Sequence, residues 1–211
     1  MKKESQVIFD KNVIEFVTVA AEFCAFLERA ESMKRSTFVD TTLKIIPLLY
    51  LKASMLPKCE MIGDESPETY VTEEIYEVLR INLASILAEK DDYLEVFLPD
   101  MAYSDEPIKK NISEDLADIY QDIKDFIFVF QLGLNETMND SLAICQENFG
   151  LLWGQKLVNT MRALHDVKYS PKARGEDEEE EEYEPENNED CHCEDDDCHC
   201  HDHGCHCHDD E

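Results

Sequence analysis

The chain has 211 residues, enough for one domain with an additional segment, and its formal net charge is −30 at pH 7. Residues 171–211 contain 19 Asp and Glu against two Lys and Arg, so this segment carries −17 of the total and the rest carries −13. Both parts are therefore expected to repel a nucleic-acid backbone and to attract metal cations or basic proteins.

No secretion signal and no membrane span are expected. The positively charged start of the chain is not followed by an apolar run, because Asp10 and Lys11 interrupt the pattern. The longest apolar run, residues 45–51, is far too short to cross a bilayer. We therefore expect a cytoplasmic protein, in which thiols stay reduced and dense cysteine indicates metal or redox chemistry rather than structural disulfides.

Two helices are predicted in the first 56 residues. Apolar residues recur at helical spacing over about residues 5–30 and again over residues 36–56, where Ser36 is the expected N-cap and Pro57 the stop. Pro47 lies inside the second helix and predicts a kink or a break, because proline removes one backbone hydrogen bond. The expected core-facing residues are Phe9, Val13, Phe16, Val17, Ala20, Cys24, Leu27, Phe38, Thr42, Ile45, Ile46, Leu49 and Ala53.

A loop and a third helix follow. Residues 57–71, which include Gly63 and Pro67, are predicted to be the loop, and its Cys59 has no evident role. Thr72 begins the helix, with two carboxylates in the first turn, where they favour the helix dipole. The expected core-facing residues are Ile75, Val78, Leu79, Leu83, Ile86 and Leu87. A short helical piece is then expected over residues 92–98, followed by a loop that reaches Asn111.

The fourth helix has the strongest pattern. Asn111 or Ser113 is expected to cap it, and Glu114 stands at the spacing of a capping box. Its wide apolar face consists of Leu116, Ile119, Tyr120, Ile123, Phe126, Ile127 and Phe130. Four carboxylates recur every three or four residues and so share one side of the helix, which we call the aspartate stripe: Asp115, Asp118, Asp122 and Asp125. The stripe is either a site for a hard cation such as magnesium or, as we prefer, a solvated face.

The last predicted helix extends over residues 137–166, which corresponds to about 45 Å of helix. Its apolar side consists of Met138, Leu142, Cys145, Phe149, Leu152, Trp153, Leu157, Met161 and Leu164. Gly150 and Gly154 lie one turn apart and indicate close approach by a neighbouring helix, since glycine otherwise costs stability. His165 is interpreted as a charge that favours the C-terminal end of the helix. Together, the patterns predict an all-α fold, an antiparallel bundle of about five helices.

Four short motifs resemble a family of small bacterial proteins: residues 92–97 (DYLEVF), 116–124 (LADIYQDIK), 153–155 (WGQ) and 162–165 (RALH). On these motifs the chain resembles the domain of unknown function 5063 family over about residues 5–168. The resemblance implies a helical fold and no established activity. Histidine is common in that family at two positions that hold Leu152 and Lys156 here, so histidine-based chemistry does not carry over to this chain.

Three segments are assigned from composition: a helical domain at residues 1–169, an acidic linker at 170–190 and a Cys/His/Asp-rich tail at 191–211. Residues 176–190 form a low-complexity acidic run. Because like charges repel and apolar residues are scarce, such a run is expected to be disordered and to act as a solvated spacer.

The tail repeats the triplet Cys-His-Cys three times, starting at Cys191, Cys198 and Cys205, and it holds six of the nine cysteines and six of the seven histidines. Thiolate and imidazole are the usual ligands of zinc, and thiolate also suits Cu(I). The Cys-x-Cys spacing resembles that of metallothioneins. Twelve ligands would fill about three four-coordinate sites. The predicted ligands are Cys191, His192, Cys193, Cys198, His199, Cys200, His201, His203, Cys205, His206, Cys207 and His208.

The sequence thus predicts a protein whose tail binds soft or borderline metal ions for buffering, storage or delivery. Zinc is favoured, with nickel, copper and cobalt as alternatives. The competing interpretation is a helical module that binds a protein partner and whose tail binds metal only incidentally. An enzyme is the least favoured class, because the aspartate stripe is its only support. Neither nucleic acid nor a membrane is expected as a partner.

Overall fold

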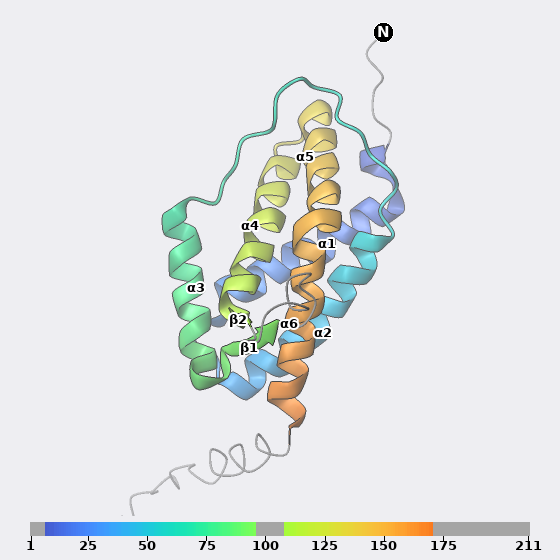
Figure 1. Ribbon diagram of the computed structural model, residues 1–211. Helices are drawn as coiled ribbons and strands as arrows, with labels where there is room; N and C mark the ends of the chain where they lie inside the picture. The colour runs from blue at the N-terminus through green and yellow to red at the C-terminus, as the bar shows by residue number, and fades with distance from the viewer. Residues whose placement is uncertain (1–6, 96–107, 171–211) are drawn as a thin grey trace, which may run out of the picture.

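In the computed structural model, which describes residues 7–95 and 108–170, six α-helices follow one another along the chain (Figure 1). They are α1 (Lys11–Glu28), α2 (Arg35–Ser54), α3 (Glu73–Leu87), α4 (Ile112–Gln131), α5 (Asn135–Asn148) and α6 (Gly154–Tyr169). A π-helical turn, Phe149–Trp153, joins α5 to α6, so these two form one rod. Single 3-10 turns occupy Val7–Phe9, Ala30–Ser32 and Ala88–Lys90. With the rod counted once, the prediction of a bundle of about five helices is confirmed.

Helix α4 lies at the centre of the bundle. It contacts α1, α3, α5 and α6, while α2 packs on α1 and α6. Figure 1 shows α4 and the α5–α6 rod running in opposite directions, joined by the short turn at residues 132–134. The long segment between α2 and α3 is a loop, as predicted, and it passes over the end of the bundle where this turn lies (Figure 1). Consequently one face of α4 is covered by several different elements.

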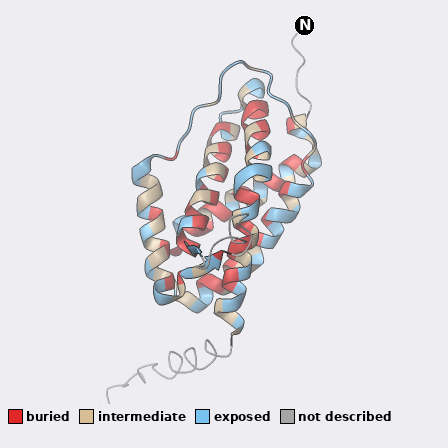
Figure 2. Cartoon of the chain, viewed as in Figure 1, coloured by how far each residue is buried: buried red, intermediate tan, exposed pale blue. Residues whose placement is uncertain are grey.

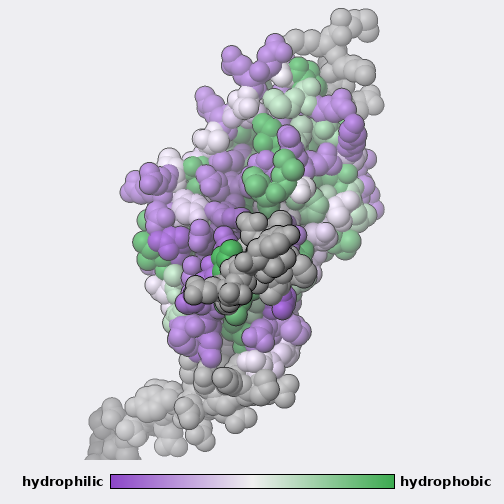
Figure 3. Space-filling view, viewed as in Figure 1, coloured by the Kyte–Doolittle hydropathy of each residue, from purple (hydrophilic) through white to green (hydrophobic). Residues whose placement is uncertain are grey.

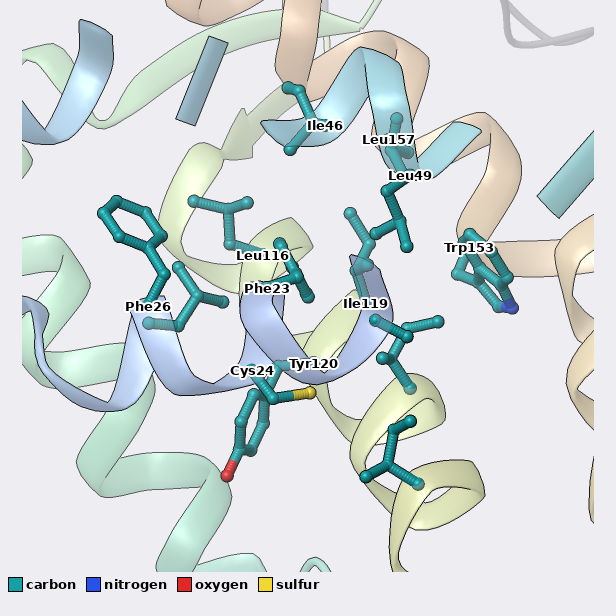
Figure 4. Close-up of a cluster of buried hydrophobic side chains, with 14 of the residues drawn as sticks. Phe23, Cys24, Phe26, Ile46, Leu49, Leu116, Ile119, Tyr120, Trp153 and Leu157 are labelled. Atoms are coloured by element: carbon teal, nitrogen blue, oxygen red, sulfur yellow. The ribbon is translucent and has the colours of Figure 1, made fainter. Parts of the chain in front are cut away.

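The core consists of the inward faces of all these helices, which appear in red in Figure 2. Figure 4 shows one part, where α1, α2, α4 and the rod bring their side chains together. The ring of Phe16 lies 5.5 Å from that of Phe126 and 6.4 Å from that of Trp153. The indole N–H of Trp153 donates a hydrogen bond of 3.1 Å to the carbonyl of Cys145, so no donor of this ring is left unpaired. Burying each large apolar side chain contributes about 1.5–3 kcal/mol.

Most of the predicted core faces are confirmed, but three residues expected inside are exposed. Phe9, Val78 and Leu152 have exposed fractions of 64%, 56% and 53%. Phe9 lies in a 3-10 turn, and Leu152 lies in the π-turn, so neither follows the α-helical period on which the prediction was based. Elsewhere hydrophobic residues also reach the surface, where Figure 3 shows them interspersed with hydrophilic ones.

Residues 92–98, predicted as a short helix, begin instead with a strand. Strand β1 (Asp92–Glu95) pairs antiparallel with β2 (Ile108–Asn111), and the register places Asp92 opposite Asn111 and Glu95 opposite Ile108. A helix of so few residues cannot repay the cost of its first turn, whereas this pairing satisfies the backbone groups of both segments.

The predicted N-cap residues are confirmed at α3 and α4, and the prediction fails at α2. The hydroxyl of Thr72 accepts a hydrogen bond from the Ile75 N–H at 3.3 Å, as expected. Helix α2 begins at Arg35, so Ser36 is not its N-cap. At α4, Asn111 occupies the N-cap position, as predicted, but its side chain makes no capping hydrogen bond. The carboxylate of Asp91 accepts instead from the backbone N–H and the hydroxyl of Ser113, at 2.7 and 2.6 Å.

The two glycines of the rod do not admit a neighbouring helix, so that prediction is wrong. A Cβ on Gly154 would lie 2.3 Å from the carbonyl oxygen of Phe149, whereas a Cβ on Gly150 would meet nothing within 4 Å. The N–H of Gly154 donates to that same carbonyl, five residues back, and thereby closes the π-turn. Gly154 therefore accommodates the rod's own backbone.

Across the part of the chain that the structure describes, none of the helices has the length and apolar character that a bilayer crossing requires.

Candidate functional site

The twelve predicted metal ligands of the tail, Cys191 to His208, lie outside the described residues, as does the acidic linker. Their grouping therefore stays a prediction. The three other cysteines are placed. Cys24 and Cys145 are buried in the core, as expected, and burial raises the pKa of the Cys24 thiol to about 12. Cys59 has a role that the sequence did not indicate, since its thiol lies 3.2 Å from the side-chain oxygen of Asn139 and links the loop to α5.

All four side chains of the aspartate stripe form hydrogen bonds with other elements. Asp115 is almost completely buried and accepts a hydrogen bond of 2.5 Å from the hydroxyl of Tyr93 on β1. Asp118 accepts one of 2.8 Å from the hydroxyl of Tyr76 on α3. The N-terminal half of the stripe is thus hydrogen-bonded to two elements that precede α4 in the chain.

The other two carboxylates contact the rod and the long loop. Asp122 accepts a hydrogen bond of 2.6 Å from the side-chain amide of Asn148, at the end of α5. Asp125 accepts two from the backbone N–H groups of Tyr70 and Val71, at 2.7 and 2.8 Å. Each aspartate therefore holds a different element against α4, and the interpretation of the stripe as a solvated face is wrong.

Lys156 brings an ammonium group to the stripe from α6. Its Nζ forms an ion pair with Asp118 and lies 3.9 Å from an oxygen of Asp115. The lysine side chain is about one third exposed, at 34%, so this ion pair is partly shielded from water. Lys156 therefore compensates the charge at one end of the stripe.

Burial disfavours the charged form of three of the four aspartates. Desolvation is the main cause that raises the pKa values of Asp115, Asp122 and Asp125. The hydrogen bond from Asn148 partly offsets this effect at Asp122, while the nearby charges of Asp125 and Asp118 add to it. Burial and the adjoining carboxylates also raise the pKa values of the Tyr76 and Tyr93 hydroxyls, which consequently remain donors.

A cavity of about 420 Å³ lies beside the stripe, between α4, the rod and the end of the long loop. Its polar lining residues are Glu68, Thr69, Asp118, Gln121, Asp122, Asp125, Ser141, Asn148 and Lys156. Its remaining lining residues are Pro67, Phe126, Val129, Ile144, Cys145 and Leu152. The cavity lining thus combines charged and apolar side chains, a combination found in the binding sites of small organic ligands.

Within residues 7–95 and 108–170, no group of three or more His, Cys, Asp or Glu side chains is arranged to hold a metal ion. The structure therefore gives no support to the hard-cation interpretation of the stripe. His165, near the C-terminal end of α6, is exposed, and its ring lies 4.6 Å from that of Tyr169 at an interplanar angle of 45°.

Sequence reasoning found the stripe but missed its partners. Tyr76, Tyr93 and Asn148 come from three elements, and their own periodicity gives no sign that they meet α4. It also missed the buried pair in which the Asn159 amide donates to the Glu95 carboxylate at 3.0 Å. The motif resemblance could have drawn attention to Lys156, because that residue occupies a position where the family commonly has histidine.

Comparison with known proteins places the fold in a family. Residues 7–170 match the family model described as "Domain of unknown function (DUF5063)". The crystal structure of protein BF1032 from Bacteroides fragilis is similar, with 92% sequence identity, a TM-score of 0.73, and coverage of 80% of this chain and 99% of that one. None of the curated proteins matches the sequence. The resemblance predicted from the four motifs is thereby confirmed, and the chain belongs to the DUF5063 family, whose function is unknown.

Proposed function

We propose that this protein binds soft or borderline transition-metal ions through residues 191–211, for buffering, storage or delivery, with zinc as the favoured ion. One observation carries the proposal: the triplet Cys-His-Cys occurs three times with an unbroken period of seven residues. Thiolate and imidazole are strong ligands for zinc and copper, and a Cys-x-Cys pair allows two sulfurs to converge on one ion.

The surrounding charge supports this function. Aspartates fill the gaps between the triplets and glutamates fill the linker, so the segment raises the local concentration of cations. Uptake of metal displaces protons from the thiols, which makes binding dependent on pH. The repeat contains no apolar residue, so the ions would be exchangeable, as buffering and delivery require.

The helical domain serves in this proposal as the carrier of the tail. The C-terminal end of α6 lies at the end of the bundle opposite the turn between α4 and α5 (Figure 1), and in the sequence the linker and then the tail follow from it.

The test is the metal content of the full chain. The protein is purified under reducing conditions without a metal-affinity tag, and its metals are measured by elemental analysis before and after titration with zinc. We expect at least about two equivalents, since twelve ligands in four-coordinate sites allow about three. A variant in which the six tail cysteines are replaced by serine is expected to lose most of this metal.

Cys59→Ser is the matched control, because it removes a partly buried thiol of the helical domain and should leave metal content unchanged. Full-length protein that contains no metal and takes up none of zinc, copper, nickel or cobalt on titration would refute the proposal. Equal metal content in the serine variant would also refute it.

The second candidate is a protein-interaction module whose tail binds metal incidentally. It is favoured by three exposed apolar residues at the C-terminal end of α2 and just after it, namely Leu48, Leu51 and Met55, with exposed fractions of 43%, 51% and 45%. An exposed apolar stripe of this kind suits a partner helix. This candidate predicts a partner that stays bound to the six-serine variant and in the presence of a chelator, an outcome that the metal-delivery proposal does not predict.

A further inference from the structure

We propose that the cavity beside the aspartate stripe binds a small organic ammonium ion, such as a primary alkylamine or a diamine, with Asp122 as its counter-ion. This inference concerns the helical domain and is independent of metal binding by the tail. It rests on the chemistry of the cavity, on the position of Lys156, and on the difference between Asp122 and its neighbours.

The cavity has the size and the mixed lining that an alkylammonium ion needs. Its volume of about 420 Å³ exceeds that of a short alkyl chain, so both a charged head and several methylene groups fit. Asp122, Asp125 and Gln121 are among its polar lining residues. Phe126 and Leu152 are among its apolar lining residues, against which methylene groups would be removed from water.

Lys156 shows that the stripe already accommodates this chemical group. Its side chain is itself a primary alkylammonium, and it lines the cavity while its Nζ forms an ion pair with Asp118. The carboxylate of Asp122 lies one helical turn further along the same stripe. A ligand amine at Asp122 would repeat the arrangement that the protein makes with its own lysine.

Asp122 differs from the aspartates on either side of it. Asp118 is neutralised by Lys156, and Asp125 accepts two backbone N–H groups of the loop. Asp122 accepts a hydrogen bond only from the side-chain amide of Asn148, and among the described residues no Lys or Arg forms an ion pair with it. The charge of Lys156 also attracts Asp122, but this effect is smaller than that of burial, which raises the pKa of the carboxyl group. A partly buried carboxylate without a direct ion-pair partner costs free energy, which a bound cation would recover.

The same comparison favours an organic ammonium over a metal ion. Calcium takes six to eight oxygen ligands, and magnesium requires near-octahedral coordination. With its neighbours engaged, Asp122 offers one carboxylate. An ammonium group needs only a few acceptors, and a carboxylate with a nearby amide oxygen such as that of Gln121 supplies them.

The π-turn brings the side chains of Asn148 and Lys156 to the same side of the rod, facing the aspartate stripe. Asn148 and Lys156 are eight residues apart, so an uninterrupted α-helix would turn them about 80° away from each other at 3.6 residues per turn. The additional residue of the π-turn reduces this difference to about 20°, and both side chains reach the stripe. Single π-turns occur frequently at functional sites, and this one forms part of the cavity wall through Leu152.

The experiment measures binding of butylamine and 1,4-diaminobutane to the full chain at about 0.15 M salt, where long-range attraction is screened. Isothermal titration calorimetry gives the affinity, and fluorescence of Trp153, the only tryptophan, reports on binding beside the π-turn. Butan-1-ol has the same chain length without the charge. We expect the amines to bind and the alcohol to bind more weakly by at least about tenfold, as the loss of a charge-assisted hydrogen bond implies.

The decisive variant is Asp122→Asn, which removes the charge but keeps an oxygen acceptor for Asn148. Glu147→Gln is the matched control, because Glu147 is exposed and does not line the cavity. Both substitutions make the net charge of the chain less negative by one unit. We expect amine affinity to fall by about tenfold or more in Asp122→Asn and to be unchanged in Glu147→Gln. Ile144→Phe, which narrows the cavity without changing any charge, should also weaken binding.

Three outcomes would overturn the inference. Equal losses in Asp122→Asn and Glu147→Gln would mean that amines are attracted only by the acidic chain. Equal binding of butan-1-ol would mean that the cavity recognises apolar groups alone. No response of either signal at about 10 mM amine, well above a Kd of 1 mM, would mean that the cavity binds no such ligand.

Discussion

Helix α2 and the α5–α6 rod each carry a residue type that normally interrupts a helix, yet only the rod is interrupted. Pro47 lies in the interior of α2, which continues as an α-helix from Arg35 to Ser54. The glycine pair of the rod lies at a change from α-helix to π-helix. The sequence predicts a kink or a break at Pro47 and an uninterrupted helix over residues 137–166, because proline is the stronger breaker. The break at Pro47 is not found.

The difference lies in what the neighbouring residues contact. Pro47 is exposed, while Ile46 and Leu49 on either side of it are completely buried against the core. The packing of these side chains fixes the path of α2 and outweighs the loss of one backbone hydrogen bond. In the rod, Trp153 is completely buried and Gly154 contacts Phe149, so the backbone itself is locked in the wider turn. A proline or glycine therefore lowers the stability of the helix locally, and tertiary packing decides whether the α-helix is interrupted at that residue.

The largest expected change in stability tests whether the packing of Ile46 keeps α2 helical on both sides of Pro47. Ile46→Ala removes a completely buried side chain, and we expect the free energy of unfolding to fall by about 2–5 kcal/mol. Leu48→Ala, on the other side of Pro47 and 43% exposed, is the control and should change it by less than about 0.5 kcal/mol. Urea denaturation measures both. Similar losses in the two variants would show that burial does not hold α2 together.

Gly154→Ala tests whether the rod's own backbone requires glycine. The new Cβ would lie 2.3 Å from the Phe149 carbonyl oxygen and 2.9 Å from its ring, so either the π-turn or the side chain must shift. We expect a loss of about 1–3 kcal/mol in the free energy of unfolding, as overpacking usually costs. A red shift of Trp153 fluorescence should accompany it. Unchanged stability would contradict the role assigned to Gly154.

Pro47→Ala tests whether the proline in α2 only lowers the stability of the protein. Alanine restores the missing N–H donor and is favoured in a helix interior by about 3 kcal/mol. Part of this gain is offset, because the native chain with Pro47 has a less flexible unfolded state and so loses less entropy on folding. We expect a gain of about 1–2 kcal/mol in the free energy of unfolding, measured by urea denaturation. A loss would show that a bend at Pro47 is needed for the packing of Ile46 and Leu49.

The smallest effect is expected at Gly150, which provides the contrast to Gly154. It is exposed and a Cβ there meets nothing within 4 Å, so Gly150→Ala only reduces the freedom of the unfolded chain. We expect a gain of about 0.5–1 kcal/mol, seen as a small rise in the midpoint of thermal unfolding. Destabilisation comparable to that of Gly154→Ala would erase the distinction between the two glycines.

The sequence predicts those parts of the fold that local periodicity determines. The core faces of α1 and α4 follow the 3.6-residue period, and residues such as Phe16 and Leu116 are buried as expected. The pairing of β1 with β2 could not be predicted, because the partner of Glu95 is Ile108 and the segment between them carries no alternating pattern. The position of the Asn111 cap was predictable, but the hydrogen bonds from Ser113 to Asp91 were not, because these two residues lie 22 positions apart in the sequence.

The candidate site was predictable only in its helical component. Spacing alone places Asp115, Asp118, Asp122 and Asp125 on one side of α4, but it cannot show which elements cover that side. The partners come from β1, α3, the long loop and the rod, and the rod meets the stripe correctly only through a π-turn that no sequence period indicates. The metal-binding prediction for the tail, in contrast, depends on a repeat that is complete in the sequence itself.

The hairpin between α3 and α4 has a consequence for protein engineering. Since Glu95 and Ile108 are paired, the two ends of the intervening sequence are fixed next to each other on the bundle. Lengthening that sequence adds only a closure entropy of about 0.6 kcal/mol for each doubling. A peptide tag or a small domain inserted there should leave the helices in place, and it would keep the C-terminal end of the chain free of any fusion.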